Sequence, residues 1–203
     1  MKIAVIAMIM AMVGAAAPPN QPHRKVKFYL RESPHVRPEV RAPALDLANK
    51  IFATIGVRLE RCSGNPPRAQ LNQHIGIELT SVTPTNILPG ALGSAMPFEG
   101  VRIQVFYDRI RSEIVPKPVL LAHVLVHEIT HILQRTNQHS ASGIMKASWS
   151  HRDHLQMRTE PLPFTPRDIE LIHEGLASRD SDALATAAED SDPCNRTAVR
   201  GHE

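Results

Sequence analysis

Cysteine is scarce in this sequence, and its scarcity limits the kinds of protein the chain can be. Two cysteines in 203 residues are too few for a disulfide-dense scaffold or for a four-cysteine zinc site. Glycine occurs only 10 times and without a period, which excludes a collagen-like chain despite the 17 prolines. An excess of one charge is also lacking, because 23 basic and 20 acidic residues are scattered along the chain and leave +3. We therefore expect no nucleic-acid partner.

Long hydrophobic runs are missing except near the N-terminus. The run at 3–13 follows Lys2 and precedes small residues, which is typical of a signal peptide and too short to cross a bilayer. A buried N-terminal strand is the alternative interpretation. We expect residues 1–17 to be removed, leaving a soluble, secreted or periplasmic protein with no membrane partner. In that compartment Cys62 and Cys194 can form a disulfide, and two free thiols are the alternative.

The apolar content is high enough for a folded domain. Hydrophobic residues make up 42% of the chain, and the roughly 185 residues left after signal removal suit one domain. Alternating apolar residues predict strands at 26–30, 57–60, 74–79 and 101–106. Apolar residues at helical spacing predict helices at 39–55, 119–135 and 165–178. The predicted fold class is α+β, with a basic arm at 18–25, a single domain at 26–178 and a polar tail at 179–203.

Histidines mark the candidate site, which lies on the 119–135 helix. This helix is apolar nearly all round, so we expect it inside the protein. His127 and His131 lie four residues apart on one helix face and can bind one metal ion. Glu128 lies beside them, where it can take a proton from a water that the ion has made more acidic. The alternative is that these side chains are satisfied in the core or face solvent. His123 lacks a following glutamate, and we interpret it as a core histidine or a support for the ligands.

A hydrolytic zinc site needs a third protein ligand. His139 is the best candidate, provided that the helix ends and the chain turns back. Asn137 tolerates a left-handed backbone and is the expected turning residue. Gly143 permits a tight turn, and Met145 is expected to form an apolar floor beneath the ligands or simply to pack in the core.

Other side chains compete for the place of the third ligand. His151 and His154 follow closely in the sequence, although a solvated loop is the default for that segment. Glu170 and Glu174 lie four residues apart on the last helix, as in proteases that take a downstream glutamate as ligand. That spacing also fits an ordinary solvated helix face.

The residues at 127–131, 139–140 and 143–145 together resemble the metzincin clan of zinc metallopeptidases, and within it the matrixins. The same run is similar to little-characterised exported bacterial proteins. The resemblance implies a zincin domain with a small twisted mixed β-sheet packed on a long helix and on the active-site helix. A Met-turn at Met145 and a C-terminal helix would follow. One departure is that seven residues separate His131 from His139, where the clan pattern has five.

The resemblance also implies a function and its residues. One catalytic Zn²⁺ would be bound by His127, His131 and His139, and Glu128 would act as general base and then as general acid in an exported endopeptidase. The segment at 90–97 looks like the matrixin edge strand that pairs with extended substrate. Its expected substrate-binding residues are Leu92, Gly93, Ser94 and Ala95. Trp149 either lines a specificity pocket or packs in the core.

The expected partner is a peptide or protein substrate, and the expected state is a monomer. Two other functions fit the same residues. One is a catalytically weak zinc- or peptide-binding protein on the same fold. The other is a structural or interaction domain in which the histidines are incidental.

Overall fold

The computed structural model of the chain describes residues 24–32, 36–64, 74–98 and 101–186. The elements in chain order are β1 (Arg24–Glu32), α1 (Pro38–Ala53), β2 (Val57–Cys62), β3 (Ile75–Thr80), β4 (Gly93–Met96), β5 (Arg102–Phe106), the 3-10 helix η2 (Tyr107–Arg109), α2 (Lys117–Gln134), α3 (His151–Met157) and α4 (Pro166–Thr186). The predicted signal peptide at 1–17 and the predicted disulfide partner Cys194 lie outside the described residues. Cys62, at the end of β2, is disulfide-bonded. None of the described helices is long and apolar enough to cross a membrane.

The described strands form one five-stranded mixed sheet in the order β2-β1-β3-β5-β4. The pairs β1–β2, β1–β3 and β3–β5 are parallel, and β4 alone is antiparallel to its neighbour β5. The antiparallel strand therefore lies at one edge of the sheet. This mixed sheet with helices agrees with the sequence-based α+β prediction at the level of architecture.

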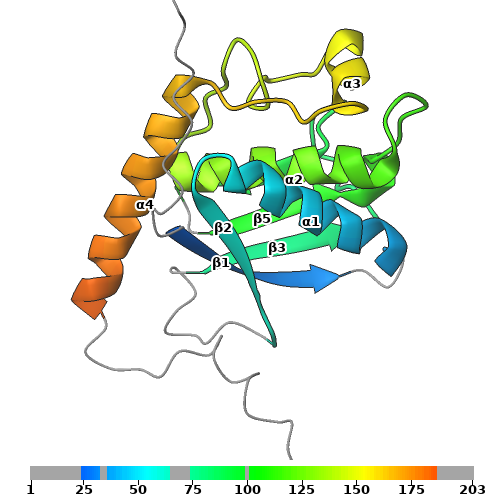
Figure 1. Cartoon of the computed structure of the whole chain (residues 1–203). Helices are drawn as coiled ribbons and strands as arrows, with labels where there is room; N and C mark the ends of the chain where they lie inside the picture. The colour runs from blue at the N-terminus through cyan, green and yellow to red at the C-terminus, as the bar shows by residue number, and fades with distance from the viewer. Residues whose placement is uncertain (1–23, 33–35, 65–73, 99–100, 187–203) are drawn as a thin grey trace, which may run out of the picture.

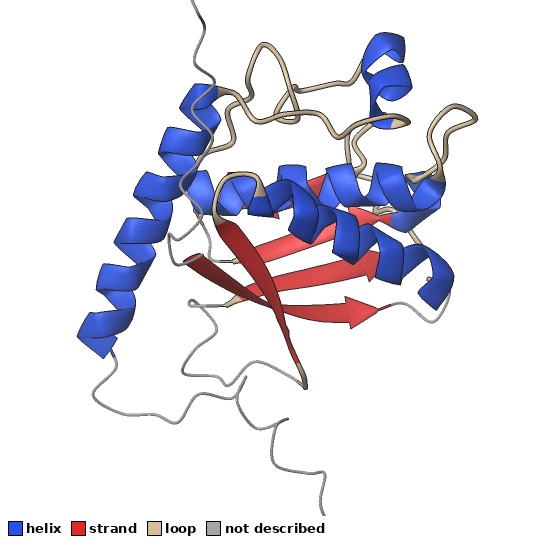
Figure 2. Ribbon diagram, viewed as in Figure 1, coloured by secondary structure: helices blue, strands red, loops and turns tan. Residues whose placement is uncertain are grey.

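Helices cover one face of the sheet (Figure 1). Helices α1 and α2 pack side by side on that face, and α4 crosses the end of α2 (Figure 2). Every residue of α2 from 120 to 133 is buried, because the sheet, the two neighbouring helices and the segment after α2 enclose it. An all-round apolar helix in the interior is the expected outcome of this sequence pattern.

Three features differ from the sequence-based expectation. Strand β1 begins at Arg24, so the last two residues of the predicted arm pair with β2, where Lys25 also forms an ion pair with Glu60 at 2.9 Å. Helix α4 continues to Thr186 rather than ending near residue 178. The segment expected to be a solvated loop around His151 contains the short helix α3, which begins with a capping box between Ser150 and Asp153.

Candidate metal centre

The first pair of candidate ligands lies on one face of α2. The ring centroids of His127 and His131 are 4.7 Å apart, and their Nε2 atoms are separated by 3.1 Å. Both side chains are buried. Spacing of four residues on a helix brings the two rings to the same side, as the sequence predicted.

Main-chain carbonyls orient both rings. His127 Nδ1 donates a hydrogen bond to the Ile144 carbonyl at 2.9 Å, and His131 Nδ1 donates to the Thr136 carbonyl at 2.9 Å. A carbonyl can only accept, so Nδ1 carries the hydrogen in each ring and Nε2 keeps its lone pair. Metal-binding histidines in proteins are commonly held in this way through their other nitrogen.

The Thr136 carbonyl lies in the turn that follows α2. Arg135 adopts a left-handed conformation with φ 53° and ψ 41°, and the N–H of Thr136 donates to the His131 carbonyl at 3.3 Å. These are the features of a Schellman ending, in which the chain reverses direction after the last helical turn. The prediction that Asn137 makes the turn is therefore wrong. The turn falls at Arg135, although this position usually favours glycine.

The reversal brings His139 back to the pair. Its ring centroid lies 5.2 Å from that of His127 and 4.9 Å from that of His131. One candidate ligand atom from each of the three histidines lies within 4.8 Å of the others, and His139 is the exposed member. Within the described ranges no other group of three potential ligands comes together in this way.

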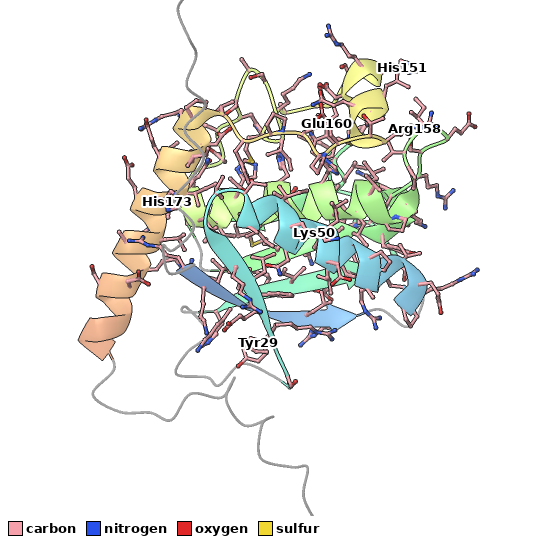
Figure 3. All side chains as sticks on the ribbon, viewed as in Figure 1. Tyr29, Lys50, His151, Arg158, Glu160 and His173 are labelled. Atoms are coloured by element: carbon pink, nitrogen blue, oxygen red, sulfur yellow. The ribbon has the colours of Figure 1, made fainter. Side chains whose placement is uncertain are left out.

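The competing ligands lie elsewhere. Glu170 and Glu174 are exposed on α4, where Arg167 approaches them at 3.0 and 3.9 Å. Figure 3 places His151 on α3, on the opposite side of α2 from the sheet. His154 lies on the same short helix. None of these four side chains belongs to the histidine group found among the described residues.

His123 is a core histidine. It is fully buried, its Nδ1 donates to the Val119 carbonyl at 2.8 Å, and its Nε2 accepts the N–H of Leu162 at 3.1 Å. Both ring nitrogens are thus satisfied by the main chain. This agrees with the expectation that His123 is not a ligand.

The donor set fits a zinc ion. Burial lowers the pKa of His127 and of His131 to about 4, against smaller opposing contributions from their carbonyl hydrogen bonds. Burial also lowers the pKa of His139. All three imidazoles are consequently neutral near pH 7 and offer nitrogen lone pairs. Three histidine nitrogens with a fourth position left open are a common donor set of catalytic zinc.

The side chain of Glu128 extends from α2 to the edge strand β4. A Cβ added at Gly93 would lie 2.7 Å from Glu128 Oε1, so the carboxyl group fills the space left by the missing side chain on β4. Glu128 is buried, and desolvation raises its pKa to about 8. The edge strand and the candidate base are therefore in direct contact.

The shape of the loop after His139 depends on a glycine in a left-handed conformation and on a main-chain hydrogen bond. Gly143 has φ +74°, and a Cβ there would lie 2.3 Å from the Pro163 carbonyl oxygen. Ser140 N–H donates to the Met145 carbonyl at 2.8 Å, which closes the loop. The closed loop presents the Ile144 carbonyl to His127. Met145 itself is fully buried in the hydrophobic core.

Trp149 packs against a candidate ligand. Its ring centroid lies 5.7 Å from that of His127 at an interplanar angle of 88°. Its Nε1–H donates to the Ile144 carbonyl at 3.2 Å, the same oxygen that accepts from His127. The indole is half-buried. Its contacts therefore support the packing interpretation of this residue.

Asp168, in the first turn of α4, is the residue that sequence reasoning missed. The side chain is buried and accepts hydrogen bonds from Ser140, Gln134 and Thr165. Burial raises its pKa, but these hydrogen bonds outweigh burial and the net pKa is lowered. The only local signal was the spacing between Thr165 and Asp168, which predicts a capping box and nothing of the longer contacts.

The expected substrate segment lies at the rim of the site. Gly93, Ser94 and Ala95 belong to β4, Leu92 precedes it, and all four residues are half-buried. No further strand pairs with the outer edge of β4 in the described part of the chain. A cavity of about 230 Å³ adjoins the end of β4 and is lined by Ala95, Met96, Pro97, Phe98 and Asn137.

Comparison with known proteins gives a limited likeness. No protein-family model matches the chain, and no protein of curated function matches it. The chain is similar to the crystal structure of archaemetzincin from Methanopyrus kandleri, with 18% identity, a TM-score of 0.49, and 78% of this chain and 98% of that chain covered. It is also similar to archaemetzincin from Archaeoglobus fulgidus complexed with malonate, with 16% identity, a TM-score of 0.47, and coverage of 72% and 100%. Because the likeness is this low, we infer function from the side chains of the site.

Proposed function

We propose that this chain is an exported zinc-dependent endopeptidase of the metzincin type, with Glu128 as general base and general acid. The observation that carries this proposal is the convergence of three histidine ligand atoms within 4.8 Å of one another, on the helix that also bears Glu128. The edge strand β4 borders the same site. A metal-binding group, a proton-transfer group and a strand edge for substrate are parts from which a metal-dependent peptidase site can be built.

His127, His131 and His139 would hold the ion. When bound, zinc supplies a Lewis acid that makes water more acidic and polarises the substrate carbonyl. The positive charge of the ion would lower the pKa of Glu128 from its raised value and favour the carboxylate form. That carboxylate takes the proton from the attacking water and passes it to the nitrogen of the leaving amine as the C–N bond breaks. Burial beneath β4 keeps bulk water away from the carboxyl group. Met145 would form the Met-turn below the ligands.

Substrate would bind as an extended peptide along the free edge of β4. Main-chain hydrogen bonds from residues 92–95 would hold it, because an unpaired strand edge offers N–H and C=O groups to a new strand. The scissile peptide bond would then lie over Glu128, since Gly93 contacts that side chain. We propose a peptide or protein as the substrate, a monomer as the active state, and no nucleic-acid or membrane partner.

Export is supported by two observations. The apolar run at 3–13 resembles a signal peptide, and Cys62 is disulfide-bonded, which favours an oxidising compartment. Expression of the full chain followed by cell fractionation and mass spectrometry of the N-terminus tests this point. We expect a processed protein outside the cytoplasm, and an unprocessed cytoplasmic protein would contradict export.

The decisive experiment for the activity is Glu128→Gln, which keeps the size of the side chain and removes its proton-transfer capacity. We expect the variant to hold one zinc per chain, measured by metal analysis, and to lose peptide cleavage by roughly 10²–10⁴-fold. Glu170→Gln is the matched control, because Glu170 is exposed on α4. Cleavage by Glu128→Gln at the wild-type rate, or a wild-type protein that binds no zinc, would overturn the proposal.

Two features of His139 favour a second candidate, a zinc-binding protein with weak activity. His139 is the exposed ligand and follows a connection longer than the clan pattern. Zinc-loaded wild-type protein that cleaves none of a diverse peptide library, while still binding zinc tightly, would select this candidate over the peptidase.

A further inference from the structure

We propose that Asp168 is a positioning residue for the third ligand, which it holds in place through Ser140. This inference rests on the zinc site of the proposed function but not on peptide cleavage. It assigns a role to a buried carboxylate on α4 that neither binds the ion nor touches the reacting groups. Its effect is to fix the direction of the chain immediately after His139.

The two oxygens of Asp168 have different partners. Oδ2 accepts from the Thr165 N–H at 2.9 Å and from the Thr165 hydroxyl at 2.6 Å, which is the local pattern of a helix cap. Oδ1 accepts from the Ser140 hydroxyl at 2.7 Å and from Gln134 Nε2 at 3.3 Å. These two residues are 28 and 34 positions away in the sequence. Capping explains Oδ2 but leaves the contacts of Oδ1 unexplained.

His139 needs an external anchor. The rings of His127 and His131 are each held by a main-chain carbonyl, whereas no hydrogen bond to the His139 ring occurs within the described ranges. His139 is also the exposed ligand. Apart from its contacts with the other two rings, its position is therefore set by the backbone on either side of it.

Ser140 provides that anchor. Its N–H is bonded to the Met145 carbonyl at 2.8 Å and its hydroxyl to Asp168 at 2.7 Å, so the residue is tied on two sides. The same oxygen of Asp168 reaches Gln134, the last residue of α2. Asp168 thus ties the loop that carries His139 to the helix that carries the other two ligands. Hydrogen bonds to an ionised, buried acceptor are stronger than neutral ones, which suits this role.

The experiment compares Ser140→Ala, Asp168→Asn and Thr165→Ala. Ser140→Ala removes only the hydroxyl, and we expect zinc affinity to fall by about 10–100-fold, the usual effect of removing a group that orients ligands. Asp168→Asn should lower the zinc affinity by a similar factor. The double variant should be little weaker than either single variant, because both remove the same hydrogen bond. Thr165→Ala keeps the Oδ1 contacts, and we expect it to lower the melting temperature while zinc affinity stays within twofold.

Three measurements separate ligand positioning from general stability. Zinc affinity is measured by competition with a chromophoric chelator, and the melting temperature is measured on the metal-free proteins. Co²⁺ binding is followed through quenching of Trp149, the only tryptophan of the chain, and through visible absorption, which changes with ligand number and geometry. We expect the absorption of the Ser140→Ala protein to differ from wild type and that of Thr165→Ala to match it.

The outcomes distinguish this inference from the proposed function. A Ser140→Ala protein whose zinc affinity is within twofold of wild type would overturn the role of Asp168 and leave the proposed function untouched. A Thr165→Ala protein whose zinc affinity falls as much as that of Ser140→Ala would do the same. A zinc-loaded wild type that cleaves no peptide would overturn the peptidase alone, and the affinity comparison would still decide the positioning role. A wild type that binds no zinc would overturn both. If Asp168→Asn fails to fold, the comparison of Ser140→Ala with Thr165→Ala decides the question.

Discussion

At the scale of single residues, Gly93 on β4 leaves the space that the side chain of Glu128 on α2 occupies. The absence of a side chain at Gly93 lets β4 pass within contact distance of the carboxyl group. The contact involves Oε1, Cγ and Cδ of the Glu128 side chain and no main-chain atom, so rotation of that side chain can relieve it. The requirement for glycine here therefore concerns the position of the proposed base, Glu128, and not the stability of the fold.

Gly93→Ala tests this distinction. The new Cβ would lie 2.7 Å from Oε1 and 2.8 Å from Cγ of Glu128, so the carboxyl group must move. We expect the specific activity to fall at least tenfold, since displacement of a catalytic group by about 1 Å can reduce the rate by 10²-fold. Zinc content and melting temperature should stay near wild type.

The control for Gly93→Ala is Gly76→Ala, because the nearest atom to a Cβ at Gly76 is 3.9 Å away. That variant should keep its activity. Equal activity of the two variants in a peptide-cleavage assay would show that Glu128 does not depend on the space at position 93.

At the scale of elements, α4 crosses the end of α2 at one glycine. A Cβ at Gly175 would lie 1.7 Å from the Leu133 carbonyl oxygen, a main-chain atom that cannot move independently of its helix. The close approach also brings Asp168 to Gln134. Helices α2 and α4 are therefore held at a fixed separation.

Gly175→Ala should destabilise the fold, although replacing glycine by alanine within a helix usually stabilises it. Alanine is favoured over glycine in a helix by about 1 kcal/mol, but overpacking costs about 1–3 kcal/mol or more. We expect a net decrease in the free energy of unfolding, measured by urea denaturation, together with weaker zinc binding. Ser181→Ala on the exposed side of α4 is the control and should not destabilise. A Gly175→Ala protein as stable as wild type would contradict the close contact.

The cap of α3 gives a prediction about pH. Partial burial raises the pKa of Asp153, but hydrogen bonds from Lys146 and Ser150 outweigh it and lower the pKa to about 2. Because the pKa of Asp153 is lower in the folded state, its ionised side chain stabilises the fold at every pH above the unfolded-state pKa, about 3.9. This contribution to the free energy of unfolding disappears as the pH falls toward 2. Asp153→Asn should thus lower the melting temperature at pH 7, and the difference from wild type should shrink between pH 4 and pH 2. A difference that is constant with pH would contradict the ionised cap.

At the scale of the whole molecule, the candidate metal centre joins segments that are distant in sequence. Its candidate ligands come from α2 and from the loop after it, and α4 supplies Asp168, which is hydrogen-bonded to that loop through Ser140. Metal binding to the folded state alone would therefore stabilise the entire domain.

Zinc should raise the melting temperature and a chelator should reverse the rise. At a free concentration of 100 times the dissociation constant, the gain is about 2.7 kcal/mol, or roughly 5–10 °C for a domain of this size. Thermal unfolding with graded zinc measures it. Magnesium is the control and should have no effect, because it prefers oxygen ligands. The same shift with magnesium, or none with zinc, would argue against the histidine site.

The parts of the fold that sequence predicted are those in which burial shows directly in the residue types, either as an alternation or as an unbroken apolar helix. The all-round apolar residues of α2 and the alternation in β1 and β3 report which faces meet the core. The helix α3 escaped prediction because seven residues are too short for a clear period.

The parts of the site that sequence did not predict depend on tertiary contacts. Arg135 adopts a left-handed conformation that its residue type disfavours, so local preference pointed to Asn137 instead. The contacts of Asp168 join residues 28 and 34 positions apart, which no local pattern records. The two helical histidines could be paired from spacing alone, whereas the sequence left His139 as the best of several candidates for the third ligand, because its approach depends on the turn at Arg135.

The use of main-chain carbonyls to orient His127 and His131 has a consequence for how this chain can change over generations. The acceptors at Ile144 and Thr136 persist whatever side chains those positions carry. Mutational drift at either position can therefore leave the geometry of both imidazoles intact. Related chains could therefore differ in the side chains around the candidate metal centre and still keep its geometry. Selection would act instead on the residues that set the path of the backbone, such as Gly143.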